Sequence, residues 1–92
     1  MSVTRINHFQ AKSGCEQTLF NFMSQVVMKI RETEGCVSCK LLKGAEDSTQ
    51  LAVIEEWTSI EVHKAAASVI PKEQLEEVMA LLAKPPFGIY FS

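Results

Sequence analysis

The chain lacks the features that mark several classes of protein. No apolar run is long enough to span a bilayer, and the first ten residues, MSVTRINHFQ, contain neither an apolar signal core nor a cleavage-site pattern. Lysine and arginine are scattered singly and the formal net charge is −2, so there is no basic stripe for a nucleic-acid backbone or an anionic membrane. We therefore expect a cytoplasmic protein that binds neither nucleic acid nor membrane.

Cysteine is too scarce for a disulfide framework. The chain has three cysteines, an odd number, and shows no sign of secretion, which predicts reduced thiols. Cys36 and Cys39 form a C-x-x-C motif, but side chains three apart in a strand should point to opposite faces, and no second pair exists. The motif therefore predicts neither a redox centre nor a zinc site, and we expect no metal site elsewhere.

No repeat, low-complexity segment or long linker divides the 92 residues, so we expect a single domain over residues 1–92. Apolar residues make up 47% of the chain, a high share for a domain this short. A chain of this size has limited capacity to bury apolar surface in its own core. We therefore expect a second copy of the chain to cover part of that surface, in a homodimer.

Three segments show the period-two alternation of β-strands. In residues 3–10 the odd-numbered side chains, Arg5 and Asn7 among them, share one face and the even-numbered ones share the other. Residues 37–42 alternate in the same way. The turn residues GAEDST then lead into QLAVIEEW, residues 50–57, so the second and third strands should form an antiparallel hairpin. The third strand is apolar on both faces, and helices can cover only one of them.

The longest helix is predicted between the first two strands. Ser13 and Glu16 have the spacing of a capping box, and Gly35 is a natural stop at the C-terminal end. Between them an apolar stripe recurs at three- and four-residue steps, and it consists of Leu19, Met23, Val26, Val27 and Ile30.

A second helical region follows the third strand. Thr58 or Ser59 could cap a short helix in IEVHKAAAS, and Pro71 is well placed to begin another helical segment. The apolar stripe of that segment, which should rest on the sheet, consists of Leu75, Val78, Met79 and Leu82. Prolines at 85 and 86 end it, and FGIYF has the aromatic and β-branched composition of a last strand.

The order of elements is strand, helix, strand, strand, helix, strand. This order predicts an α+β fold, a ferredoxin-like βαββαβ sandwich with both helices on one face of a four-stranded antiparallel sheet. The other face of the sheet needs a partner, which the sheet of a second subunit would supply.

Two stretches connect this sequence to a known family. The run EGCVSCKLLKG, followed by a hairpin, LAVIEEW and a polar turn into a helix, resembles the antibiotic biosynthesis monooxygenase domain, which includes quinol monooxygenases. The resemblance extends from Val3 to Phe91 and implies a dimeric α/β barrel with a substrate pocket in each subunit between sheet and helices. It also implies oxidation of a small aromatic quinol or polyketide-like phenol by dioxygen, with no cofactor.

Such chemistry needs a polar group that takes or steers a proton, a donor for the developing oxyanion and an apolar cavity that excludes water. We expect these groups among Arg5, Asn7, His8, Trp57 and His63. His63 and Asn7 are the catalytic candidates, and Arg5, Trp57 and His8 are candidates for substrate binding.

Each candidate also has a structural interpretation. His63 could be an exposed helix residue, because many relatives carry their His three positions later, where this chain has Ala66. Trp57 could close the core, and Arg5 could pair with Glu55 or Glu56. Asn7 could be an ordinary strand-surface residue.

Two other functions remain open. The first is a non-catalytic dimeric barrel that binds a hydrophobic small molecule or serves as an interaction module. The second is haem binding and degradation, for which Asn7 matches a family position. Haem-degrading members also need a ligating His and a second Trp in the later helix, where this chain has AAAS.

Overall fold

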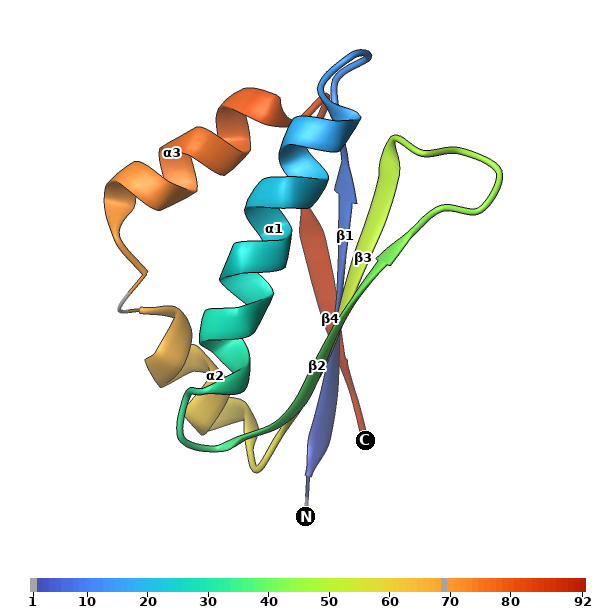
Figure 1. Ribbon diagram of the computed structural model, residues 1–92. Coiled ribbons are helices and arrows are strands. Elements are labelled where there is room, and N and C mark those ends of the chain that lie inside the picture. Colours follow the sequence, from blue (N-terminus) through green and yellow to red (C-terminus); the bar gives the residue numbers. More distant parts are fainter. Residues whose placement is uncertain (1, 69) are drawn as a thin grey trace.

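The computed structural model describes residues 2–68 and 70–92. In chain order the elements are β1 (Val3–Gln10), α1 (Glu16–Arg31), β2 (Cys36–Lys43), β3 (Gln50–Trp57), α2 (Ile60–Ala67), α3 (Lys72–Leu81) and β4 (Phe87–Phe91). The four strands form one antiparallel sheet in the order β2-β3-β1-β4 (Figure 1). The predicted α+β, ferredoxin-like sandwich is confirmed.

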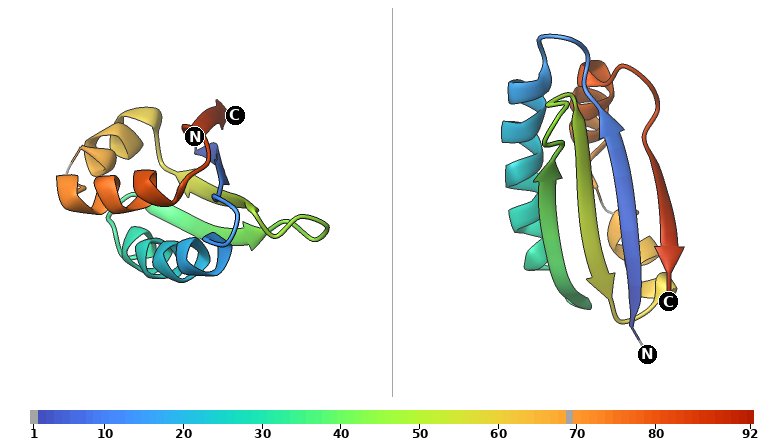
Figure 2. Two further views of the ribbon diagram at one scale, coloured as in Figure 1. Left: turned by 90° about the horizontal axis from the view of Figure 1, so that it is seen from above. Right: turned by 90° about the vertical axis from the view of Figure 1, so that its right-hand side faces the viewer.

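The three helices cover one face of the sheet and leave the other open, as the two further views show (Figure 2). The main core lies between α1 and the sheet, where the helix contributes three buried side chains, Leu19, Met23 and Val27. They pack with buried residues of β2 and β3, including Leu51 and Val53. The predicted stripe of the long helix is therefore confirmed at its centre.

The start of α1 differs from the prediction. Cys15 occupies the N-cap position without a side-chain hydrogen bond, so Ser13 is not the cap. Gly14 adopts a φ of +87° in the preceding turn, and its amide donates to the Glu16 carboxylate at 2.9 Å. The turn at Gly14 therefore moves the helix start beyond Ser13, and the capping-box prediction was wrong.

A β-bulge changes the geometry of β2. The pairing register with β3 shifts between Cys36 and Ser38, which leaves Val37 as the extra residue with 56% of its surface exposed. Cys36 then pairs with Trp57, and Cys39 pairs with Glu55. Because those partners are two apart on β3, the two cysteines lie on the same face of the sheet. The expectation that they point to opposite faces was wrong, because it assumed an unbroken strand.

These thiols are nevertheless poor nucleophiles. Burial, with a further contribution from the Glu55 carboxylate, raises the pKa of Cys39 to about 12 and also raises that of Cys36. A thiol with a raised pKa is protonated at neutral pH and reacts slowly. The geometry thus adds no redox function to the motif.

The second helical region packs only partly against the sheet. Ser59 caps α2 by accepting a hydrogen bond from the Val62 amide at 3.1 Å, and Pro71 occupies the N-cap position of α3. On α3, Leu75 and Met79 each keep 49% of their surface exposed. Two members of the predicted stripe do pack inward: Val78 lies against the main core, and Leu82, just past the helix, is buried and bridges to Ala11. The space left under α2 and α3 forms a cavity.

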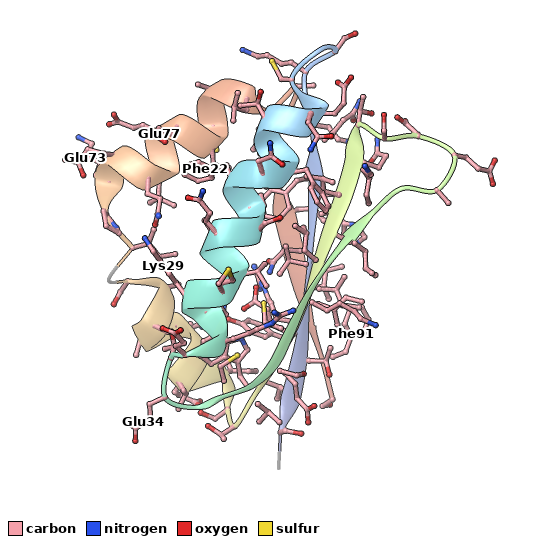
Figure 3. All side chains as sticks on the ribbon, viewed as in Figure 1. Phe22, Lys29, Glu34, Glu73, Glu77 and Phe91 are labelled. Atoms are coloured by element: carbon pink, nitrogen blue, oxygen red, sulfur yellow. The ribbon has the colours of Figure 1, made fainter. Side chains whose placement is uncertain are left out.

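The open face of the sheet carries a group of apolar side chains. Its centre carries Ile6 and Ile54 from the two middle strands, which are antiparallel partners. Towards the edges it carries the exposed side chains of Leu42, Phe87, Ile89 and Phe91. Phe91 lies on the side of the sheet away from the helices (Figure 3).

Candidate active site

A cavity of about 450 Å³ lies between the helices and the helix-facing side of the sheet. This volume falls in the range of about 300–1,000 Å³ that is typical of small-molecule sites. Most of its wall is apolar and comes from β1, β3, α1 and α3, and it includes Phe9, Met23, Val26, Ile30, Val53, Leu75, Val78 and Met79. An aromatic ligand could exchange water for apolar contacts over most of its surface there.

One end of the cavity is polar because of the sheet register. Arg5 pairs with Glu55 and Asn7 pairs with Val53 across β1 and β3, so Arg5, Asn7, Glu55 and Trp57 all project to the helix-facing side. Asn7 Nδ2 donates to Glu55 Oε2 at 2.7 Å, and Trp57 Nε1 donates to Glu55 Oε1 at 2.7 Å. Arg5 Nε donates to Asn7 Oδ1 at 2.9 Å. Glu55 is therefore the centre of a hydrogen-bonded network.

His63 reaches this network from α2. Its Nε2 lies 3.8 Å from Glu55 Oε1, and its Nδ1 lies 2.5 Å from the hydroxyl of Tyr90 on β4. The ring also packs edge-on against Trp57, with the ring centroids 5.4 Å apart. The Arg5 guanidinium lies over the Tyr90 ring, 4.6 Å from its centroid, and so completes the cluster.

Burial shifts the pKa values of Glu55 and His63 in the directions that favour the uncharged form of each side chain. Glu55 is only 4% exposed, and desolvation raises the pKa of its carboxyl above 4.5, although the hydrogen bond from Trp57, the Arg5 charge and the hydrogen bond from Asn7 oppose the rise. Desolvation lowers the pKa of His63 below 6.5, and the positive charges of Arg5 and Lys64 lower it further. At neutral pH the imidazole is therefore mainly uncharged.

Gly88 makes room for the inner part of the cluster. It pairs with Asn7 across β1 and β4. A Cβ at this position would lie 2.2 Å from Asn7 Oδ1 and 2.6 Å from Arg5 Cζ, both far inside van der Waals contact. The two side chains thus occupy the space that any larger residue on β4 would fill.

The mouth of the cavity has a different character. Lys29, which is exposed, lines it together with Thr33, Gln74, Ile70 and Pro71. Lys29 lies on the side of α1 that faces α2 and α3 (Figure 3), and it forms no ion pair with any residue the structure describes. The cavity therefore has a polar inner end, an apolar middle and one positive charge at the mouth.

The structure brings four of the five predicted site residues together. Arg5, Asn7, Trp57 and His63 all line the cavity. His8 lies on the open face, where its ring stacks on Phe87 with the centroids 4.8 Å apart, so it does not reach this site.

Two residues of the cluster were not among the predicted site residues. Glu55 was considered only as an ion-pair partner of Arg5, and Tyr90 was treated only as part of a strand. A signal for Glu55 was present in the sequence, because alternation from the buried Leu51 and Val53 places it on the same inward face. A carboxylate at an inward position is costly without a specific role or partner.

The described residues form neither a metal site nor a membrane-spanning helix. Across residues 2–68 and 70–92, no three or more His, Cys, Asp and Glu side chains are grouped so that they could hold a metal ion. Within the same part of the chain, none of the helices has the length and apolar character that crossing a membrane requires.

Known structures share this fold. The protein Rv0793 from Mycobacterium tuberculosis superposes with a TM-score of 0.87 at 19% sequence identity, over 100% of this chain and 94% of that one. A conserved protein from Methanosarcina mazei gives 0.88 at 17% identity, over 99% and 91%. SnoaB, a cofactor-independent oxygenase from Streptomyces nogalater, gives 0.83 at 18% identity, over 99% and 91%.

Sequence comparison gives the family. No curated protein sequence matches this chain significantly. The family model described as antibiotic biosynthesis monooxygenase matches residues 2–68, which is more than half of the chain and contains β1, β3, α2 and every cavity-lining member of the polar cluster. The chain belongs to the antibiotic biosynthesis monooxygenase family.

Proposed function

We propose that this protein is a cofactor-independent monooxygenase that oxidises a small aromatic quinol or polyketide-like phenol with dioxygen. The observation that carries the proposal is the cavity itself, whose apolar middle leads to a polar end where Arg5, Asn7 and Glu55 are hydrogen-bonded and His63 lies beside Glu55. A flat aromatic ring fits the apolar part, and its hydroxyl group meets the cluster. Membership of the family and the fold shared with SnoaB support the same chemistry.

In the reaction the substrate supplies the electrons. Loss of the phenolic proton gives an electron-rich phenolate, which passes one electron to dioxygen, and the two radicals join at a ring carbon. Loss of that carbon's hydrogen and cleavage of the O–O bond leave a carbonyl on the ring and release the second oxygen atom as water. One phenol and one dioxygen thus give one quinone and one water.

The roles of the residues follow from their donors and their position. Arg5 and Asn7 retain N–H groups beyond those in the network, and these can stabilise the developing oxyanion. His63 acts beside them in steering the proton. Trp57 holds Glu55 and forms part of the wall. The surrounding apolar side chains exclude water, which strengthens each of these electrostatic interactions.

We also propose that the protein works as a homodimer in the cytoplasm, with the open faces of two sheets packed together. Four large apolar side chains on that face are 42–52% exposed in the single chain: Leu42, Phe87, Ile89 and Phe91. Large exposed apolar side chains gathered on one face are typical of an interaction surface. A partner sheet would also cover Ile6 and Ile54 between them.

A second candidate function is a non-catalytic dimer that uses the same cavity to bind a hydrophobic molecule. Ala66 favours it, because this methyl group lines the cavity where many relatives have an imidazole. Haem degradation is disfavoured because the chain has AAAS where haem-degrading members need a ligating His and a second Trp in the later helix.

Oxygen uptake with a panel of quinols and phenols tests the proposal. We expect the wild type to consume one dioxygen per substrate and to release no hydrogen peroxide, while the variants His63→Ala and Asn7→Ala are at least tenfold slower. Autoxidation without protein is the baseline. No uptake above that baseline on any substrate, together with saturable quenching of Trp57 fluorescence by the same compounds, would establish the binding protein instead. A Soret shift on mixing with hemin would support haem binding.

A further inference from the structure

Resting on the proposed function, we propose that Glu55 is the group that takes the substrate's proton. Tyr90 is a positioning residue, which holds His63 in the tautomer that carries its proton on Nε2. His63 is then a hydrogen-bond donor in the site and not its base.

Glu55 is placed to accept a proton from a ligand. Among the residues that line the cavity it is the single carboxylate. Each of its oxygens accepts one hydrogen bond, Oε1 from Trp57 and Oε2 from Asn7. A carboxylate oxygen can accept two, so each oxygen keeps one acceptor position. The two fixed donors hold the carboxylate in one orientation, which is what a positioned base requires.

The position of Tyr90 decides what His63 can do. A tyrosine hydroxyl that donates to Nδ1 leaves the imidazole proton on Nε2, where it points towards Glu55 Oε1 at 3.8 Å. The other tautomer would place the lone pair of Nε2 against the negative carboxylate, which is repulsive. The favoured tautomer has no free lone pair on Nε2, so His63 cannot take a proton there. Its Nε2–H can instead donate to oxygen atoms of the substrate.

The charges around the pair favour the same arrangement. Arg5 of β1 contributes a positive charge to both groups, and Lys64 of α2 contributes one to His63. On β2, Cys36 and Cys39 interact with the Glu55 charge, and their raised pKa values keep them neutral. The positive charges of Arg5 and Lys64 therefore lower the pKa of His63 and favour the uncharged imidazole.

In this proposal Glu55 accepts and returns each proton that moves during the reaction. The carboxylate removes the phenolic proton and becomes a carboxylic acid, and it returns that proton to the substrate peroxide formed with dioxygen. It next removes the hydrogen of the peroxide-bearing carbon as the O–O bond breaks. It finally protonates the departing hydroxide, so water leaves and the carboxylate is restored.

The first test compares Glu55→Gln with Glu34→Gln. The glutamine at position 55 keeps the size of the side chain and an acceptor oxygen but cannot take the proton. Glu34 is exposed and points away from the helices and the sheet (Figure 3), so it serves as the matched control. We expect kcat for oxygen uptake to fall by about 10²–10⁴-fold in Glu55→Gln and to remain unchanged in Glu34→Gln. A Glu55→Gln variant with at least one-third of wild-type kcat would overturn the assignment.

The second test measures the tautomer and needs no turnover. In the wild type, ¹⁵N chemical shifts of the His63 ring should show the proton on Nε2 at pH 7. In Tyr90→Phe we expect a mixture of both tautomers and a kcat reduced several-fold at nearly constant KM. A role in packing alone would leave the tautomer unchanged.

The outcomes separate the two proposals. Active wild type with the proton on Nδ1 would overturn the role of Tyr90 while the monooxygenase function stood. If the wild type consumed no oxygen on any substrate, the proposed function and the assignment of Glu55 as its base would both fall. The tautomer would then decide the positioning role of Tyr90 alone.

Discussion

Replacement of Gly88 by alanine tests the packing of the polar cluster directly. At a free position in a strand, Gly→Ala stabilises a protein by about 0.4–1 kcal/mol, because the unfolded chain loses conformational freedom. The backbone of Gly88 does not have a positive φ, so alanine is compatible with its conformation. Here, however, the new methyl group would collide with Asn7 Oδ1 at 2.2 Å and with the end of the Arg5 side chain at 2.5–2.6 Å.

The size of the effect follows from these contacts. Carbon and oxygen need a separation of roughly 3.4 Å, so Asn7 Oδ1 has to move by about 1 Å. Such a movement breaks the 2.7 Å hydrogen bond from Asn7 to Glu55. A hydrogen bond to a charged group contributes about 1.5–3 kcal/mol, and this one is partly buried. After subtraction of the gain from alanine, we expect Gly88→Ala to lower the free energy of unfolding by about 1–2 kcal/mol.

Urea unfolding followed by the fluorescence of the single Trp57 measures this change. All samples need the same protomer concentration, because the stability of a dimer depends on it. The control is a double-mutant cycle with Asn7→Ala, which removes the atom that the methyl group meets. In that background the cost of Gly88→Ala should fall by more than half. Equal costs in both backgrounds, or a Gly88→Ala protein more stable than the wild type, would refute the argument.

Three further predictions concern the open face, the acid group and the mouth of the cavity. Ile89→Lys should convert the dimer to a monomer in sedimentation velocity, whereas Met28→Lys, at a site 61% exposed on α1, should not; dimers from both would show that the open face is not the interface. The pKa of Glu55 is raised by burial, so its contribution to stability is complete below pH 4.5 and is lost as the pH rises through the folded-state pKa. The wild type should therefore lose stability relative to Glu55→Gln as the pH rises above about 4.5, and a difference that is constant from pH 4 to 8 would contradict this. Lys29→Gln should raise KM about 2–5-fold for quinols with a carboxylate and leave it unchanged for neutral ones, since an exposed ion pair contributes about 0.5–1 kcal/mol; equal effects on both substrates would count against an ionic contact.

The strands could be predicted from the sequence because their signals are local. β1, β3 and β4 have the predicted residues, 3–10, 50–57 and 87–91. Each has period-two alternation or a compact β-branched and aromatic run, and turn residues or prolines bound it. The faces also followed, so Arg5 and Asn7 were correctly placed on one side of the sheet.

The bulge in β2 could not be predicted because it depends on how β2 pairs with β3 and packs against α1, not on the local sequence. Val37 alternates correctly in the sequence, yet it is the residue left out of the ladder. The bulge lets both Cys36 and Cys39 face α1, where Cys39 is buried in the core. Period-two alternation describes a regular strand and carries no information on where an extra residue is inserted.

The cluster around Glu55 needed the order of the strands as well as their faces. His63 was recognised from its chemistry, but its two neighbours come from β3 and from β4 at the end of the chain. Tyr90 reaches the site because β4 pairs with β1, which places it opposite Arg5. Local sequence patterns do not predict which strands pair when they lie far apart in the chain.

His63 brings an imidazole to the polar end of the cavity, although the family resemblance implies a His at the position that is Ala66 in this chain. Ala66 lines the cavity and leaves room there, while His63, nearly one turn earlier on α2, lies at the polar end beside Glu55. Each ring nitrogen of His63 has a neighbour: the Tyr90 hydroxyl lies at Nδ1, and the Glu55 carboxylate lies near Nε2. These partners restrict the ring to donating a hydrogen bond. The proton acceptor then has to be the carboxylate, and the apolar surroundings that raise its pKa make it a stronger base for a phenol.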